Sequence, residues 1–270
     1  MGRANLLGRL SGTLSALLLG AVVLTTPAIA ETMPEGFVYL RDADPTILQD
    51  MRYGTANNFV GKTVPGYEAP ECVLVKAAAE ALKGVQAKLR EKGLTLKVYD
   101  CYRPARAVKA FVDWAKLPDD PKAKSVYYPE LEKRALFPDY IATVSSHSRG
   151  ATVDLTMVPV DASAEPTMPA AGTATPCTTE LGTRAPDTSI DMGTGFDCFD
   201  VKAHTIIPGL TPEQRQNREM LVEAMRRHGF KNYAKEWWHY TLDGEPYPAT
   251  IFDFPIAPRG QGSPQEGTKK

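Results

Sequence analysis

The stretch Ser145–Met157, SSHSRGATVDLTM, sets an imidazole and a carboxylate seven residues apart across a glycine-containing bend. If the part after the bend is a strand, Thr152, Asp154 and Thr156 share one face and three apolar side chains share the other. The apolar face can pack in a core while Asp154 faces a cleft, to which His147 can also point. An imidazole and a carboxylate suit zinc, but for these two residues taken alone a satisfied polar pair at a strand end is the favoured interpretation, and a third ligand must come from elsewhere.

The motif EWWHY, which begins at Glu236, offers that third ligand. In a straight strand Glu236 and His239 face opposite ways, so both serve one centre only if Glu236 lies in a turn or bulge before the strand. His147, Asp154 and His239 then supply three zinc ligands and leave a position for water. Glu236 is placed to take a proton from water, and Arg103 to neutralise an oxyanion, which is hydrolase chemistry.

Arg103 is expected at a corner between a strand and a helix. The segment 94–102 alternates apolar and polar residues, which predicts a strand with one buried face, and Pro104 then opens a helix. Such corners often line clefts. A capping or salt-bridging arginine is the alternative for this segment taken alone.

The length, composition and charge of the chain limit the class of protein to which it can belong. The chain has 270 residues, 43% of them hydrophobic and 23% charged, with a formal net charge of -1. That is enough for a sizeable core. Charges of both signs are interspersed, so we expect no nucleic-acid partner and a small-molecule substrate.

Residues 1–30 have the form of a cleavable secretory signal, with two arginines, a short apolar run and small residues before the cleavage point. An uncleaved anchor is the alternative. We expect an exported protein, periplasmic or secreted, with no stable membrane insertion after cleavage. In that oxidising compartment cysteines can pair.

Four cysteines permit three pairings. The positions of the cysteines relative to the predicted elements favour Cys72–Cys101, because Cys72 begins a predicted helix whose following strand ends at Cys101. They also favour Cys177–Cys198, because Cys198 can tie a polar insertion back to the body. Buried free thiols remain the alternative.

Helix and strand patterns alternate too few times for a doubly wound parallel sheet, so we predict one α+β domain with a mainly antiparallel sheet flanked by helices. It spans residues 31–257, with 159–190 as an exposed insertion and 258–270 as a flexible tail. A helix is expected from near Pro70 to Gly93, and another, opened by a capping box at Thr211, to Gly229. Their predicted inner faces are Leu74, Ala77, Ala78, Ala81, Val85 and Leu89 in the first, and Met220, Leu221, Ala224 and Met225 in the second.

Several motifs together resemble a known family. SSHSRGATVD, EWWH and DCYRPARAV, with YGTANNFVGKTVPGY and MGTGFD, occur in the order found in VanX-type D-alanyl-D-alanine dipeptidases, zinc enzymes of the D,D-peptidase/hedgehog-like fold. The resemblance covers roughly residues 50–255. It implies one zinc ion per chain on His147, Asp154 and His239, with Glu236 as general base and Arg103 as transition-state stabiliser.

The same resemblance implies that Asp197 holds the substrate ammonium and that Ser145, Tyr53 and Tyr67 lie near the bound dipeptide. Thr152 departs from the alanine usual in the family motif, and the insertion is longer than expected. His204 and His228 are rival ligands. His228 lies in the last turn of a helix, where it suits the helix dipole.

We therefore expect a zinc dipeptidase that cleaves D-Ala-D-Ala or similar D,D-dipeptides. One alternative is a D,D-carboxypeptidase that trims longer peptidoglycan peptides, and another is a non-catalytic, zinc-containing wall-binding domain. Oligomeric state and the choice among wall recycling, nutrition and resistance are left open.

Overall fold

The computed structural model describes residue 1 and residues 32–161, 175–184 and 187–260, so all but the first residue of the predicted signal segment and most of the predicted tail lie outside the described residues. The strands are β1 (Phe37–Tyr39), β2 (Leu48–Gln49), β3 (Val73–Val75), β4 (Leu94–Asp100), β5 (Thr152–Pro159), β6 (Phe230–Asn232) and β7 (His239–Leu242). The α-helices are α1 (Leu40–Ala43), α2 (Lys76–Arg90), α3 (Ala105–Lys116), α4 (Pro121–Tyr127) and α5 (Pro212–Arg227). Short 3-10 helices are η1 (Arg52–Gly54), η2 (Lys133–Leu136), η3 (Ser146–Arg149) and η4 (Val201–Ala203).

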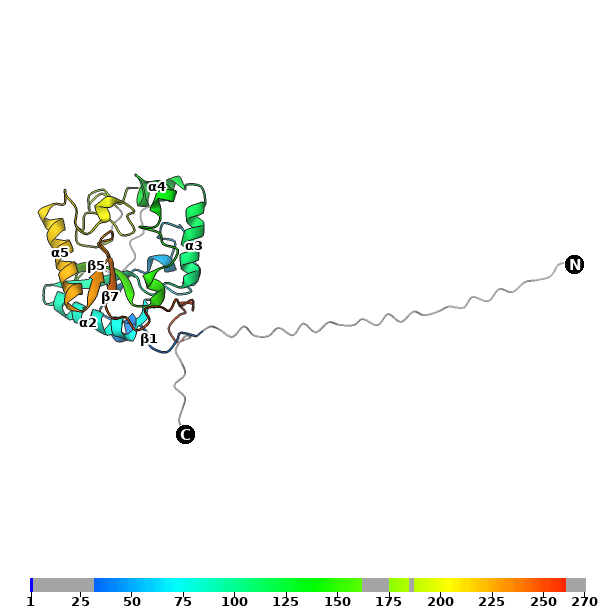
Figure 1. The fold of residues 1–270 in the computed structure, drawn as a ribbon, viewed down its shortest axis with the longest axis horizontal. Coiled ribbons are helices and arrows are strands. Elements are labelled where there is room, and N and C mark those ends of the chain that lie inside the picture. The colour runs from blue at the N-terminus through cyan, green and yellow to red at the C-terminus, as the bar shows by residue number, and fades with distance from the viewer. Residues whose placement is uncertain (2–31, 162–174, 185–186, 261–270) are drawn as a thin grey trace, which may run out of the picture. The chain divides into compact units, whose positions relative to one another are not determined.

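Five strands form the main sheet in the order β2-β4-β5-β7-β6. Only the β2–β4 pair among them is parallel, which confirms the predicted α+β fold with a mainly antiparallel sheet. Helix α2 packs on β4, α5 packs on β6, and the two helices contact each other, so they share one face of the sheet. In the view of Figure 1, β5 and β7 lie between α5 and α3. Within the described residues, every helix is too short or too polar to cross a membrane.

The central strands β4 and β5 are buried on both faces, so the prediction of one buried face for β4 is wrong. Residues 187–190 cover part of the polar face of these strands. The hydroxyl of Tyr99 donates to Asp187 at 2.8 Å, and the hydroxyls of Thr156 and Ser189 lie 2.6 Å apart. Each buried polar group in these pairs therefore keeps a hydrogen-bond partner.

This cover belongs to the segment 159–190, which was predicted to be an exposed insertion. Residues 162–174 and 185–186 of it lie outside the described residues. Cys177, Arg184, Asp187 and Ser189 are buried, so the predicted exposure is wrong for that part. The composition of the segment is polar, but the carboxylate of Asp187 and the hydroxyl of Ser189 bond to side chains of the sheet.

Helix α2 begins at Lys76, six residues after the predicted start at Pro70. Residues 73–75, two of them β-branched valines, pair with β1 instead, which places Leu74 in a strand. The buried face of α2 is Ala78, Ala79, Leu82, Val85, Gln86 and Leu89, whereas Ala77 is exposed.

Helix α5 begins as predicted, because the side chains of Thr211 and Gln214 form the reciprocal bonds of a capping box. It ends at Arg227, two residues before the predicted end at Gly229, and its fully buried apolar residues are Leu221 and Met225. Helix α3 follows Pro104, which confirms the strand-to-helix corner around Arg103.

Both predicted disulfides, Cys72–Cys101 and Cys177–Cys198, are present and leave no cysteine free. The prediction that Cys72 begins a helix is wrong, because Cys72 directly precedes strand β3. The Cys72–Cys101 bridge still forms because the residues beside it meet: the amide of Tyr102 donates to the carbonyl of Val73 at 2.9 Å.

The bend predicted before β5 is the helix η3, which Gly150 ends with φ +80°. A Cβ at this position would lie 2.2 Å from the ring of Phe37. Glycine is thus required both by its backbone conformation and by the lack of space.

We predict that Gly150→Ala lowers the free energy of unfolding by about 2 kcal/mol or more, since it adds a steric clash to an unfavourable backbone angle. The matched control is Gly93→Ala, which has a similar φ of +73° but nothing within 4 Å of the new Cβ. It should cost only about 1 kcal/mol. Equal losses in denaturant unfolding of the two variants would show that contact with Phe37 is unimportant.

Candidate metal centre and active site

The sheet register aligns three chemically important residues across neighbouring strands. Asp154 of β5 lies opposite His239 of β7 on one side and opposite Asp100 of β4 on the other. His147 comes from η3, immediately before β5. Residues from distant parts of the sequence therefore meet at the middle of the sheet.

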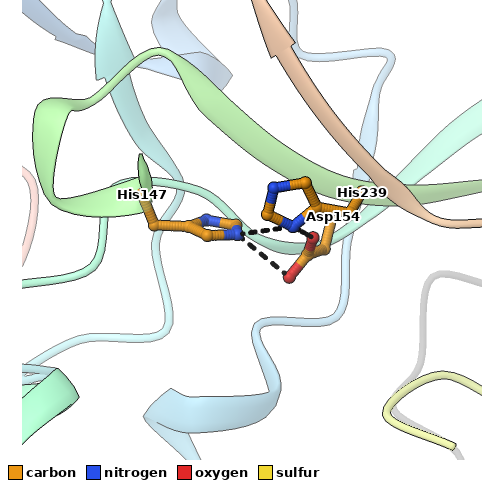
Figure 2. A group of neighbouring side chains, drawn as sticks. All are labelled: His147, Asp154 and His239. Atoms are coloured by element: carbon orange, nitrogen blue, oxygen red, sulfur yellow. Dashed lines mark hydrogen bonds and ion pairs between the residues drawn. The ribbon is translucent and has the colours of Figure 1, made fainter. Parts of the chain in front are cut away.

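His147, Asp154 and His239 point toward one another (Figure 2), and their ligand atoms all lie within 4.8 Å of one another. Nε2 of His147 is 3.3 Å from Nδ1 of His239 and 3.4 Å from Oδ2 of Asp154. Nδ1 of His239 is 3.1 Å from Oδ1 of Asp154. That buried oxygen receives no hydrogen bond from the described residues. Two imidazoles and a carboxylate with an unsatisfied oxygen fit a divalent cation.

In each of the two histidines, the ring nitrogen that faces away from the cluster has a partner that fixes the orientation of the ring. Nδ1 of His147 donates to the carbonyl of Cys101 at 2.7 Å, which leaves Nε2 to act as a ligand. Nε2 of His239 lies 3.4 Å from the hydroxyl of Ser146, so its Nδ1 faces the cluster. Burial alone would raise the pKa of Asp154, but its contacts with His147 and His239 lower it below the ordinary value.

Glu236 lies in the turn before β7, as predicted. Its amide donates to the carbonyl of Tyr233, and its carboxylate is 3.3 Å from Nδ1 of His239. Burial raises the pKa of Glu236 well above its ordinary value, and the charges of Asp154 and Asp197 raise it further. A buried carboxyl with a raised pKa beside a cation site is suited to accept a proton.

Arg103 points to the same region from the β4–α3 corner. Its Nη2 lies 3.6 Å from Oδ2 of Asp154, and its guanidinium lies 5.1 Å from the ring centres of Tyr53 and Phe111. The alternative of a salt-bridging arginine is also realised, because Arg103 binds Asp100 at 2.8 Å. One arginine can do both, since the bond to Asp100 fixes its direction.

Asp100 was missed by the sequence analysis. It is fully buried and accepts hydrogen bonds from Nε of Arg103 at 2.9 Å and from the hydroxyl of Tyr67 at 2.6 Å. Its Oδ2 also lies 3.5 Å from Nδ1 of His147. The available signal was its position at the end of a predicted strand, three residues before Arg103.

Asp197 is buried, and the hydroxyl of Tyr53 lies 2.9 and 3.0 Å from its two carboxylate oxygens. Burial raises the pKa of Asp197 to about 8, and the negative charge of Asp154 adds to the effect. The carboxylate is therefore poorly compensated, which favours a cationic group beside it.

A cavity of about 290 Å³ connects these groups. Eight of the nine residues predicted for the site line it: Tyr53, Arg103, Ser145, His147, Asp154, Asp197, Glu236 and His239. Tyr67 lies outside the set of described lining residues, where it supports Asp100. Apolar walls come from Phe59, Phe111, Phe199 and Trp238.

The rival histidines are engaged elsewhere. Nε2 of His204 lies 3.2 Å from the hydroxyl of Tyr140, and Nδ1 of His228 lies 2.9 Å from the carbonyl of Ala224. The ring of His228 also packs against Gly84 of α2. Neither belongs to the cluster of His147, Asp154 and His239.

Two histidines, an aspartate and a buried glutamate around one cavity define a site of the metallopeptidase class. Residues 33–169 and 165–257 match the model of peptidase family M15, described as D-Ala-D-Ala dipeptidase. The chain belongs to this family of metallopeptidases.

Similar proteins extend over most of the chain. A D-alanyl-D-alanine dipeptidase of Enterococcus faecalis is 37% identical over 226 residues, which are 83% of this chain and 100% of the relative. The protein of that name in Streptomyces coelicolor has the same identity and coverage. The one in Escherichia coli is 29% identical over 201 residues, 73% of this chain and 80% of the relative.

We predict that Asp100→Asn destabilises the fold by about 3 kcal/mol in denaturant unfolding, because it leaves the buried Arg103 without its closest carboxylate. Asp113→Asn is the control, since Asp113 contacts Lys109 and Lys116 on the surface. That variant should unfold nearly like the wild type. If both variants unfolded alike, Asp100 would not be the buried counter-charge described here.

Proposed function

We propose that the protein hydrolyses D-Ala-D-Ala, or a similar D,D-dipeptide, to free D-amino acids with one zinc ion per chain. The observation that carries the proposal is the approach of His147, Asp154 and His239 to one another beside Glu236. Membership of the D-Ala-D-Ala dipeptidase family and relatives of that name support the same substrate. Two nitrogens and one carboxylate oxygen are ligands that zinc accepts.

A zinc ion bound there would supply Lewis acidity and lower the pKa of water to about 7. Glu236 then accepts the proton of the attacking water and can return it to the leaving amine. The position of Arg103, with Nη2 3.6 Å from Asp154, allows its guanidinium to stabilise negative charge on the carbonyl oxygen of the scissile bond. Apolar walls that include Trp238 limit the access of bulk water.

Selection of a dipeptide requires recognition of a free amino terminus. Asp197 lines the same cavity as Glu236 and is held by Tyr53, so we assign it to the substrate ammonium. Ser145 and Tyr53 are then neighbours of the bound dipeptide, whereas Tyr67 acts through Asp100. A carboxylate at the ammonium site favours a dipeptidase over a D,D-carboxypeptidase that acts on blocked or longer peptides.

We also propose that the protein is exported, with residues 1–30 as its signal. The two disulfides support an oxidising environment. A periplasmic or secreted enzyme would meet D,D-dipeptides outside the cytoplasm.

Glu236→Gln should lower kcat for D-Ala-D-Ala by about a thousandfold, because the amide cannot accept the proton. Bound zinc, measured by atomic absorption, should remain near one per chain. Glu71→Gln is the control, since Glu71 pairs with Arg41 outside the cavity, and it should leave both quantities unchanged. Full hydrolysis by zinc-loaded Glu236→Gln would remove Glu236 from the role of base.

The wild-type protein should hydrolyse free D-Ala-D-Ala at least a hundredfold more efficiently in kcat/KM than N-acetyl-D-Ala-D-Ala, because acetylation removes the cation that Asp197 binds. Asp197→Asn should reduce this preference mainly by raising KM for the free dipeptide. A preference of the wild type for the acetylated substrate would instead identify a D,D-carboxypeptidase.

A further inference from the structure

Asp197 is held in an unfavourable backbone conformation. Its φ is +56°, in the left-handed region that residues with a side chain rarely adopt, although aspartate tolerates it better than most. Such a conformation persists only where neighbouring residues fix it. The residues on both sides of Asp197 are therefore informative.

Phe196, on the N-terminal side, is fixed by contacts of its ring with Tyr99 and Arg52. Its ring stacks on Tyr99 with centroids 4.5 Å apart, and the hydroxyl of Tyr99 donates to Asp187. The guanidinium of Arg52 lies 5.0 Å from the centre of the Tyr99 ring and 6.0 Å from that of Phe196. Phe196 is thus linked to Asp187 of the preceding segment through Tyr99.

Cys198, on the C-terminal side, is fully buried and bonded to Cys177. The amide of Gly195 donates to the carbonyl of Cys177 at 2.9 Å, so the bridge joins two stretches that are also paired through their backbones. Cys177 in turn donates its amide to Val126 at the end of α4. The backbone beside Asp197 is thus covalently joined to Cys177, whose own backbone is hydrogen-bonded to α4.

The segment that provides Cys177 and Asp187 is itself attached to the sheet. Ser189 bonds Thr156 of β5, and the amide of Ile190 donates to the carbonyl of Met157 at 3.1 Å. Cys177, which is bonded to Cys198, and Asp187, which bonds the Tyr99 ring stacked on Phe196, therefore both belong to one part of the chain, residues 175–184 and 187–190. This part of the chain belongs to the segment 159–190.

We propose that the Cys177–Cys198 bridge and the Tyr99–Asp187 hydrogen bond are positioning elements that fix Asp197 for a free amino terminus, and so help to restrict the substrate to unblocked dipeptides. The inference rests on the proposed function, because it takes Asp197 as the partner of the substrate ammonium. It assigns the inserted segment a role in specificity. The bridge and the Tyr99–Asp187 hydrogen bond involve neither the metal ligands nor Glu236, so the chemical step should be affected little.

The test compares wild type with the double variant Cys177→Ala/Cys198→Ala on free and N-acetylated D-Ala-D-Ala. We expect KM for the free dipeptide to rise about tenfold with kcat changed less than threefold, because misplacement of a binding group weakens substrate recognition. KM for the acetylated dipeptide should change little, so the preference for a free amine falls. Isothermal titration of D-Ala-D-Ala into the same variants carrying Glu236→Gln should show the same loss of affinity without turnover.

Tyr99→Phe provides a second, milder variant if the double variant does not fold, because it removes one hydroxyl and keeps the ring stack. It should raise KM for the free dipeptide two- to threefold. The matched control is Tyr39→Phe, because the hydroxyl of Tyr39 donates to the carbonyl of Ala257 and bonds to none of the described residues of the segment that holds Asp197. Control kinetics should equal those of the wild type.

An unchanged KM in folded variants, or an equal rise for both substrates, would overturn the positioning role while leaving the proposed function intact. Failure of the wild type to hydrolyse any D,D-dipeptide would instead overturn the proposed function, and this inference with it.

Discussion

The alignment of Asp154 with its neighbours across the sheet is the constraint on which the site depends. Successive side chains of a strand point to opposite faces, so a shift of β5 by one residue would turn Asp154 away from His239. The same register sets Asp100 opposite Asp154 and thereby supports Arg103. The different surroundings of the two faces fix this register strongly, because a shift would bring apolar side chains of β5 to the face where Thr156 bonds Ser189 and would bring its polar side chains into the apolar core.

The buried carboxyl groups of the site impose a second constraint, which is electrostatic. Asp100, Asp154, Asp197 and Glu236 are all buried within one region, and the pKa of each except Asp154 is raised, with burial as the largest cause. Arg103 offsets only part of this negative charge. A divalent cation at the histidines would stabilise the ionised carboxylates, and a substrate ammonium would do so beside Asp197. The protein thus places unfavourable charge where the proposed cofactor and substrate would relieve it.

Much of the fold and of the candidate site could be predicted from the sequence. Period-two alternation indicated β5, the capping box gave the start of α5, and the spacing of Glu236 and His239 required the turn that the structure contains. The choice of histidine nitrogens, however, depends on Cys101 and Ser146, which approach only in the folded chain. Asp100 and the buried part of the insertion were missed because their partners are distant in sequence, and hydroxyl-rich composition does not distinguish a solvated loop from one bonded to a polar sheet face.

The most direct test of the central claim is X-ray diffraction from zinc-loaded crystals, measured above and below the zinc absorption edge. The account predicts one anomalous peak about 2.0–2.2 Å from Nε2 of His147, Nδ1 of His239 and an oxygen of Asp154. A peak at His204 or His228 instead, or none at the three predicted ligands in protein that hydrolyses D-Ala-D-Ala, would contradict it.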